Sequence, residues 1–343
     1  MISNKELSDI KKILDKVRKP LFFFDDDEDG LCSYLLLKRH FGKGEGVFVK
    51  GNLYVNYSKK AESYGPDYVF ILDKPVVTQE FIDDIKAHII WIDHHTPIKL
   101  DNIKCYNPRI KDPDDRRPVS YWCYKIVKKD LWIATVGCIG DWYLPEFSKD
   151  FSKKYGDLLP VFIKDPGNAL FKSKVGELCK IFNFILKGKS LDIRKCLEFL
   201  EEIESPYEIL NKTTNRGKFI YDRFEQVNKH YKILLEKAMN TEIKDNVLLF
   251  TYSAKEYSLS NFLSNELIYN FPDVLVIVAR EKDDNVRLSL RSQTHLLPKL
   301  IEKALYGIDG YGGGHEHACG GNVAKKDFIK FIDSIKEQIK NQK

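Results

Sequence analysis

The 343-residue sequence contains no apolar run of membrane-spanning length, and residues 1–5 do not begin a signal-peptide core. Its seven cysteines are scattered and odd in number, which argues against a disulfide framework. Internal repeats and low-complexity tracts are also missing. These absences argue against a membrane protein and against a disulfide-rich secreted domain, so we expect the protein in the cytoplasm.

The composition is ordinary for a globular protein, with 43% hydrophobic and 31% charged residues. The length suits two domains, each large enough to bury a core. The net charge of +5 permits nucleic-acid binding without requiring it. Because many acidic residues gather in one segment, the rest of the surface is more basic than the net charge suggests.

Acidic residues and histidines stand at the ends of three short apolar runs. The run Leu-Phe-Phe-Phe leads into residues 25–30, Tyr-Val-Phe-Ile-Leu leads into Asp73, and Ile-Ile-Trp-Ile leads into residues 93–95. Such runs predict buried parallel strands, and ligands bind beyond the carboxyl ends of strands of this kind. Crowded carboxylates repel one another and resist desolvation unless cations neutralise them. The sequence therefore predicts a metal site at one edge of the sheet.

The ligand types indicate which metal the site would hold. Carboxylate oxygens with one or two imidazoles, and Cys32 as the one cysteine near them, suit Mn²⁺ or Mg²⁺. The number of carboxylates, some of them able to bridge, favours two ions over one. Two adjacent ions activate water and clamp the oxygens of an in-line phosphoryl displacement, so we predict phosphoester hydrolysis.

The apolar periodicity predicts two α/β regions joined by a helical one. We expect an α/β fold with a parallel-sheet N-terminal domain over residues 1–205, a connecting helix over 206–242 and a smaller α/β domain over 243–343. The expected elements are helices over 5–18, 31–41, 175–187, 192–203, 217–238, 258–270 and 325–340, strands over 247–250, 274–278 and 285–292, and loops over 106–118 and 307–321.

The last predicted strand and the glycine-rich loop after it carry groups that suit phosphate. Arg287, Ser289 and Arg291 alternate with valine and leucine and so face one side of the strand. Guanidinium forks match phosphate oxygens. The glycines let backbone N–H groups approach an anion, and a following helix N-terminus would add a favourable dipole. A solvent-exposed strand face and an ordinary flexible turn are the alternative interpretations.

Five segments resemble, in order, the motifs of the DHH phosphoesterase superfamily. They are DxDxDG at residues 25–30, Asp73, DHH at 93–95, GCIGD at 137–141, and GGGHxxAxG at 312–320, which resembles the signature of the DHH-associated C-terminal domain. The resemblance spans roughly the whole chain. The DxDxDG motif is similar to that of RecJ-type nucleases, and the chain as a whole resembles the archaeal RecJ-like group.

The resemblance implies roles for individual residues. Asp93 would orient the neighbouring imidazoles, and His95 would contact the scissile phosphate. Asp25 stands where many relatives place a histidine, which changes the charge of one ligand. The implied metal ligands are Asp25, Asp27, Asp29, Asp73, His94 and Asp141, with Asp73 bridging, and the implied substrate contacts are Arg287, Ser289, Arg291, Gly312, Gly313, Gly314 and His315.

The resemblance implies a hydrolase that holds single-stranded nucleic acid in a cleft between its two domains. We expect exonucleolytic cleavage of DNA or RNA from the 5′ end with two divalent ions, Mn²⁺ before Mg²⁺, and a replication or repair protein as a partner. The chain has little room for the added OB-fold of longer RecJ nucleases. This leaves open a nanoRNase, a nucleotide bisphosphate phosphatase or a cyclic-dinucleotide phosphodiesterase. A non-catalytic replication scaffold is less favoured, because every ligand position holds Asp or His.

Overall fold

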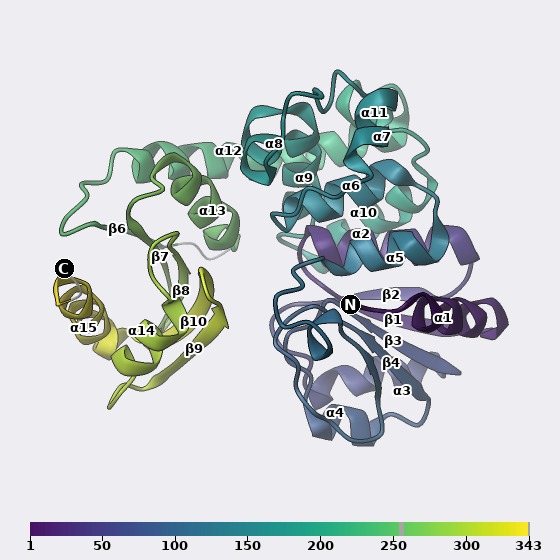
Figure 1. The fold of residues 1–343 in the computed structure, drawn as a ribbon, viewed down its shortest axis with the longest axis horizontal. Coiled ribbons are helices and arrows are strands. Elements are labelled where there is room, and N and C mark those ends of the chain that lie inside the picture. The colour runs from purple at the N-terminus through teal and green to yellow at the C-terminus, as the bar shows by residue number, and fades with distance from the viewer. Residues whose placement is uncertain (254–256, 342–343) are drawn as a thin grey trace. The chain divides into compact units, whose positions relative to one another are not determined.

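The computed structural model describes residues 1–253 and 257–341. The chain forms two compact units, Met1–Asp222 and Arg223–Lys343 (Figure 1). Their border lies inside the long helix α12 (Asn215–Met239), so the helix that we expected to connect two domains contributes to both units. None of the described helices is long and apolar enough to cross a membrane.

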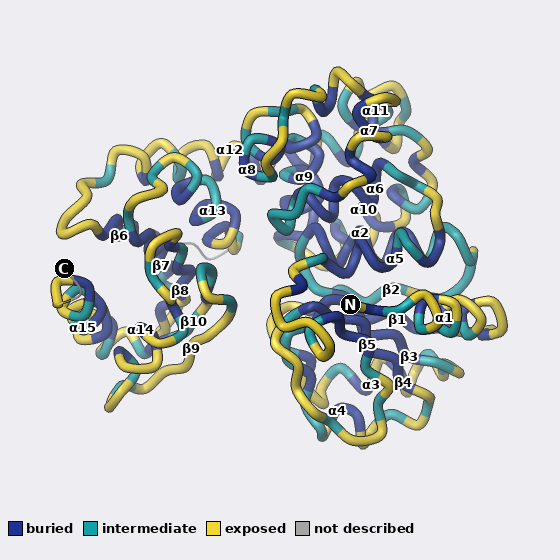
Figure 2. The backbone as a smooth tube through the Cα atoms, in the orientation of Figure 1, coloured by how far each residue is buried: buried dark blue, intermediate teal, exposed yellow. Residues whose placement is uncertain are grey.

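The N-terminal unit is built on a five-stranded sheet of order β2-β1-β3-β4-β5, in which all pairs run parallel. The three apolar runs of the sequence are β1, β3 and β4, and their central residues are buried, as expected for a parallel sheet covered on both faces (Figure 2). The parallel-sheet prediction is confirmed. The strands are β1 (Pro20–Asp25), β2 (Glu45–Val49), β3 (Tyr68–Leu72), β4 (His88–Ile92) and β5 (Lys104–Tyr106).

Alternate side chains of these strands pack on opposite faces of the sheet. On one face, Phe23, Ile71 and Trp91 join a core with α3 (Ser58–Tyr64) and α4 (Gln79–Asp84). On the other, Phe24 stacks on Tyr34 of α2 at a ring-centroid distance of 4.8 Å. Helix α2 (Glu28–Phe41) packs on β1, α5 (Val119–Val127) and α6 (Leu131–Gly140) pack against α2, and α1 (Asn4–Lys16) packs against α5.

The rest of the unit is helical, in line with the predicted helices over 175–187, 192–203 and 217–238. Helices α7 and α8 pack against α6, α10 packs against α2, and α9 packs against both. The helices of this part are α7 (Ser148–Lys154), α8 (Pro166–Lys172), α9 (Lys174–Ile185), α10 (Ser190–Glu202), α11 (Pro206–Leu210) and α12.

Helix α2 begins three residues earlier than the expected start at Leu31, because Asp27 caps it by accepting a hydrogen bond from the N–H of Gly30 at 3.0 Å. Gly30 lets this first turn approach β1 closely. A Cβ at that position would lie 2.6 Å from the backbone nitrogen of Asp25.

We expect Gly30→Ala to destabilise the protein by about 1–3 kcal/mol, the usual cost of overpacking, although alanine has the higher helix propensity. Denaturant unfolding followed by circular dichroism would measure the change. Gly320→Ala is the control, because its Cβ would meet only the carbonyl oxygen of Leu288 at 3.8 Å. Equal stabilities of both variants would contradict the close approach.

The C-terminal unit holds a mixed five-stranded sheet of order β6-β7-β8-β10-β9, in which β6 and β7 are parallel and the other pairs antiparallel. Val286, Leu288 and Leu290 of β8 pack on one face with α14 and α15. Helix α13 packs against β7 and β8. The elements are β6 (Val247–Ser253), α13 (Ser260–Asn270), β7 (Leu275–Lys282), β8 (Asn285–Arg291), α14 (Leu297–Ala304), β9 (Gly310–His315), β10 (Ala318–Ala324) and α15 (Phe328–Lys340).

The prediction of a glycine-rich loop over residues 307–321 is wrong, because most of this segment forms the hairpin β9–β10. Glycine is usually depleted in strands, but here the chain passes close to its neighbours. A Cβ on Gly312 would lie 2.9 Å from Ile301, and one on Gly314 would lie 2.6 Å from the carbonyl oxygen of Ala318. Many of the backbone N–H groups that we assigned to an anion therefore belong to the sheet, and strand β10 separates the glycines of β9 from α15.

Candidate metal centre

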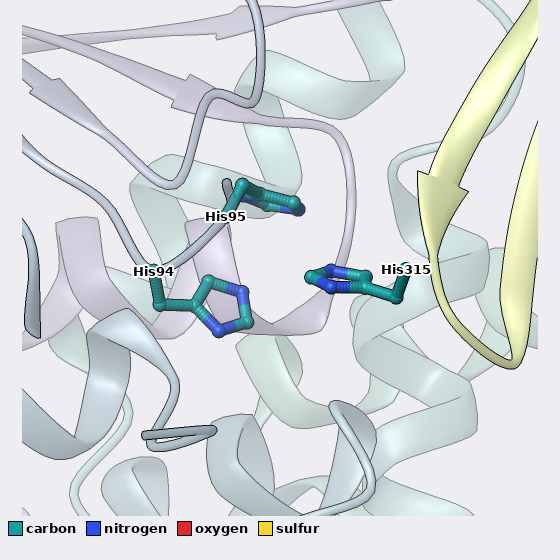
Figure 3. A group of neighbouring side chains, drawn as sticks. All are labelled: His94, His95 and His315. Atoms are coloured by element: carbon teal, nitrogen blue, oxygen red, sulfur yellow. The ribbon is translucent and has the colours of Figure 1, made fainter. Parts of the chain in front are cut away.

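The acidic and histidine side chains of the N-terminal unit gather beyond the carboxyl ends of its strands, as the sequence predicts. Asp25 is the last residue of β1, Asp73 follows β3, and residues 93–95 follow β4. Asp141 comes from a helix instead, at the end of α6. Figure 3 shows the imidazoles of His94 and His95 after β4, and His315 at the end of β9 in the other unit.

Asp73 belongs to three sets of candidate ligand atoms: one also contains Asp93 and His95, and the other two consist entirely of implied metal ligands. Asp25, Asp27 and Asp73 form one of these two sets and Asp29, Asp73 and His94 the other, and within each set the ligand atoms lie within 4.8 Å of one another. His94 Nε2 lies 3.4 Å from Asp73 Oδ1 and 3.6 Å from Asp141 Oδ2. The structure thus brings all six predicted ligands to one edge, with Asp73 common to both sets.

The surroundings of the Asp73 carboxylate favour a bound cation. It is only 1% exposed, and its Oδ1 has no hydrogen-bond donor among the described residues. Burial, together with the charges of nearby carboxylates, raises the pKa of Asp73 well above its ordinary value. A buried carboxylate oxygen without a donor is costly, and a metal ion would satisfy it. The donor set of carboxylates and imidazole fits Mn²⁺ or Mg²⁺.

The carboxylates on the first turn of α2 show the same crowding. Burial and then the neighbouring charge of Asp25 raise the pKa of Asp27 to about 8. Burial raises the pKa of Asp29 to about 6, although its carboxylate accepts hydrogen bonds from the N–H groups of Val119 at 2.7 Å and Ser120 at 2.8 Å. Asp29 therefore also accepts hydrogen bonds from the first N–H groups of α5, and these bonds fix the orientation of its carboxylate.

Asp93 orients His95. Its carboxylate accepts hydrogen bonds from the backbone N–H of His95 at 2.8 Å, from His95 Nδ1 at 2.9 Å, and from Asn107 Nδ2 at 3.2 Å. Because a carboxylate only accepts, Nδ1 carries the proton of this contact. Burial lowers the pKa of His95, but the contact with Asp93 and the charges of Asp25 and Asp27 together raise the pKa above its ordinary value.

Sequence reasoning missed Lys74, which is buried beside the cluster. Its ammonium donates to Asp25 Oδ1 at 2.6 Å, to the carbonyl oxygen of Val49 at 3.4 Å and to the carbonyl oxygen of Gly51. Lys74 is 1% exposed and thus supplies a fixed positive charge to one of the predicted ligands. Its position directly after Asp73 was the available signal, but a lysine after a strand is usually exposed.

The predicted substrate residues of the C-terminal unit share one sheet face only in part. Arg287, Ser289 and Arg291 alternate along β8, as predicted, but Ser289 is buried and its hydroxyl lies 2.8 Å from that of Ser264 in α13. Arg291 donates from Nε to Asn265 at 2.6 Å and from Nη2 to Asn261. Helix α13 therefore holds the Arg291 guanidinium in place.

The glycines of β9 alternate between the two faces. In the β8-β10-β9 register, Arg291 aligns with Ala318 and then His315, and Ser289 aligns with Gly320 and then Gly313. Gly313 and His315 therefore lie on the face of Arg291, whereas Gly312 and Gly314 lie on the other. A Cβ on Gly313 would meet nothing within 4 Å, so this part of the face is open.

Comparisons with known proteins show a family match for the C-terminal unit and a shared fold for the chain. Residues 245–341 match the family model of the DHHA1 domain. The fold of the chain is similar to that of RecJ from Thermus thermophilus in complex with Mn²⁺, at 13% identity and a TM-score of 0.73, covering 99% of this chain and 56% of that one. This chain thus spans about half the length of that RecJ. A search of curated proteins finds no significant match.

Two further structures share the fold. The DHH domain of a member of the s1p family of ribosomal proteins is 14% identical, with a TM-score of 0.70, covering 98% of this chain and 89% of that one. The pGpG-specific phosphodiesterase PggH from Vibrio cholerae is 16% identical, with a TM-score of 0.53, covering 94% and 99%. The chain therefore has the fold of these RecJ and DHH-domain structures, and residues 245–341 match the DHHA1 domain, in agreement with the resemblance seen in the motifs.

Proposed function

We propose that the protein is a metal-dependent phosphodiesterase that cleaves single-stranded DNA or RNA from the 5′ end. The observation that carries the proposal is the convergence of five other Asp and His side chains with Asp73, whose buried Oδ1 has no hydrogen-bond partner among the described residues. Crowded, buried carboxylates repel one another, and bound cations would neutralise them. The RecJ from Thermus thermophilus, which has the same fold, was solved with Mn²⁺.

The protein's own residues would prepare the reaction as follows. The two sets of implied metal ligands that share Asp73 would hold two divalent ions, preferably Mn²⁺, which would activate water and stabilise the charge of the transferring phosphoryl group. Asp93 holds the proton of His95 on Nδ1 and fixes the direction of its other ring nitrogen. The imidazolium favoured by Asp93 would donate from Nε2 to a non-bridging phosphate oxygen.

Digestion of 5′- and 3′-labelled DNA and RNA strands with Mn²⁺, read by product length, tests this proposal. Mononucleotides released in order from the 5′ end are the expected products. Release from the 3′ end would contradict the proposed polarity, and an intact strand in every metal would contradict the nuclease. A replication or repair protein as a partner belongs to the same proposal and would be sought by affinity capture of the active protein.

A phosphodiesterase for short oligonucleotides is the second candidate. The chain covers 99% of PggH, whereas it covers 56% of the Thermus RecJ. Parallel reactions with a dinucleotide and a long strand separate the two candidates. Rapid cleavage of the dinucleotide with a nearly inert long strand would favour the second one. A non-catalytic scaffold would cleave neither substrate, although every predicted ligand position holds Asp or His.

We expect Arg291→Ala to weaken the binding of a 5′-phosphorylated oligonucleotide by about 1–3 kcal/mol, the scale of a lost charge-assisted hydrogen bond. The salt dependence of binding should become shallower, because one phosphate contact is lost. Metal occupancy, measured by mass spectrometry, should not change. Fluorescence anisotropy at several salt concentrations is the measurement.

Lys299→Ala is the matched control for Arg291→Ala, because it removes one exposed positive charge from α14, on the other side of the sheet. Unchanged affinity and salt slope in Arg291→Ala would leave Arg291 with only its role of joining β8 to α13.

A further inference from the structure

Two arginines face each other on neighbouring strands of the C-terminal sheet. Arg280 of β7 and Arg287 of β8 are directly opposed in the antiparallel register, so their side chains lie on the same face. Neither forms an ion pair with a carboxylate in the described part of the chain. Like charges directly opposite each other destabilise a strand pair, so this arrangement needs a physical explanation.

Arg280 is the more unusual of the two because it is buried. Its side chain is 5% exposed, and its Nε has no hydrogen-bond acceptor among the described residues. Nη1 donates to the carbonyl oxygen of Tyr257 at 3.3 Å. Burial lowers the pKa of Arg280, and the charge of Arg287 lowers it further. A buried guanidinium without a counter-ion is costly, and a second cation beside it adds to that cost.

The arginine pair borders an open part of the sheet. In the same cross-strand row, Arg287 aligns with Asn322 of β10 and then with Tyr311 of β9, which is 66% exposed. The next row contains Gly320 and Gly313, which have no side chains to cover the sheet. An anion can therefore approach the exposed Arg287 across the backbone of Gly320 and Gly313, with Arg280 opposite Arg287 on the neighbouring strand.

We propose that Arg280 and Arg287 form a second phosphate-binding position, which takes a backbone phosphate of a nucleic-acid strand. The inference rests on the proposed function for the first position, at Arg291 and His315. Arg291 stands four positions after Arg287, roughly 13 Å along a strand. The single phosphate of a mononucleotide reaches one position only, whereas a strand of several nucleotides spans both. The second position thus selects strands over mononucleotides.

Binding without metal tests the inference on the full chain. Chelator is present throughout, and the probes are a mononucleotide 5′-phosphate and a 5′-phosphorylated oligonucleotide of about five nucleotides, within the size range of single-strand modules. We expect Arg287→Ala to weaken oligonucleotide binding about tenfold and to flatten its salt dependence. Mononucleotide binding should stay unchanged. Arg287→Lys should retain most of the affinity, and Lys299→Ala all of it.

Three outcomes would overturn the inference. If Arg287→Ala binds the oligonucleotide with unchanged affinity, there is no second position. If the variant loses as much affinity for the mononucleotide as for the oligonucleotide, the two positions are one and the same. If inorganic phosphate alone shows the same dependence on Arg287 as the oligonucleotide, the ligand is a free anion and not a strand. Because no turnover is measured, a protein that hydrolyses nothing can still pass this test, and an active nuclease can fail it.

Thermal unfolding supplies a check that does not depend on nucleotides. Arg287 and Arg280 repel each other when no anion is bound, so Arg287→Ala should raise the melting temperature in phosphate-free buffer of low ionic strength. A lower melting temperature for Arg287→Ala in phosphate-free buffer would mean that Arg287 stabilises the sheet by itself, which contradicts the inference.

Discussion

Replacement of Asp73 by asparagine is expected to abolish hydrolysis, with a loss greater than the 10–100-fold that follows removal of a residue outside the ligand set. Asp73 belongs to both sets of implied metal ligands, so its loss would disturb both metal positions. Asparagine is the right substitute because Asp73 has a φ of +58°, a conformation that asparagine tolerates better than alanine.

The same variant should fold at least as well as the unmodified protein in the absence of metal. Asp73 is buried, not the surface carboxylate that a strand end suggests, and its neighbours are carboxylates that raise its pKa. A neutral amide removes this repulsion, so the melting temperature in chelator should not fall. Asp84→Asn, at the exposed end of α4, is the control and should keep full activity. Full activity in Asp73→Asn with normal metal content would contradict the two-metal assignment.

Removal of divalent ions is expected to abolish activity completely, and Mn²⁺ should restore it better than Ca²⁺. Calcium prefers more ligands at longer distances, whereas each of the two ligand sets in the candidate site offers three ligand atoms close together. One of these sets includes a histidine, which suits manganese. Activity is measured after chelation, dialysis and addition of each ion. Undiminished hydrolysis in excess chelator would exclude a metal-dependent reaction.

Metal binding should also be visible without turnover. Because an ion neutralises the crowded carboxylates of the folded protein only, Mn²⁺ at about 100 times its Kd should add about 2.7 kcal/mol of stability. The melting temperature should rise accordingly, and the rise should be much smaller in Asp73→Asn. Equal shifts in both proteins would place the bound ion elsewhere.

Much of the N-terminal unit was predictable, because its signals are local. Three apolar runs ending in acidic residues predicted β1, β3 and β4 and the edge at which their side chains meet. The parallel arrangement followed from burial on both faces, since a strand with no polar face needs cover on each side. The sequence motifs then placed Asp141, which arrives from a helix and which strand patterns alone do not reveal.

The hairpin β9–β10 was not predictable from local signals. Glycine-rich segments favour turns, and Gly312 to Gly314 become strand only because β10 pairs with both β8 and β9. The energy that selects the strand comes from these distant partners and from the close approach of Ile301, which a larger side chain would prevent.

By itself, the sequence determined the fold class and the six candidate ligands, because the apolar runs and the motifs that follow them are local features of the chain. The tertiary structure decided which charged side chains lie next to one another. It placed Lys74 against Asp25, Asp93 against His95, and Arg280 opposite Arg287. The free energy of a charge depends on burial and on neighbours distant along the chain, and both arise only when the strands come together.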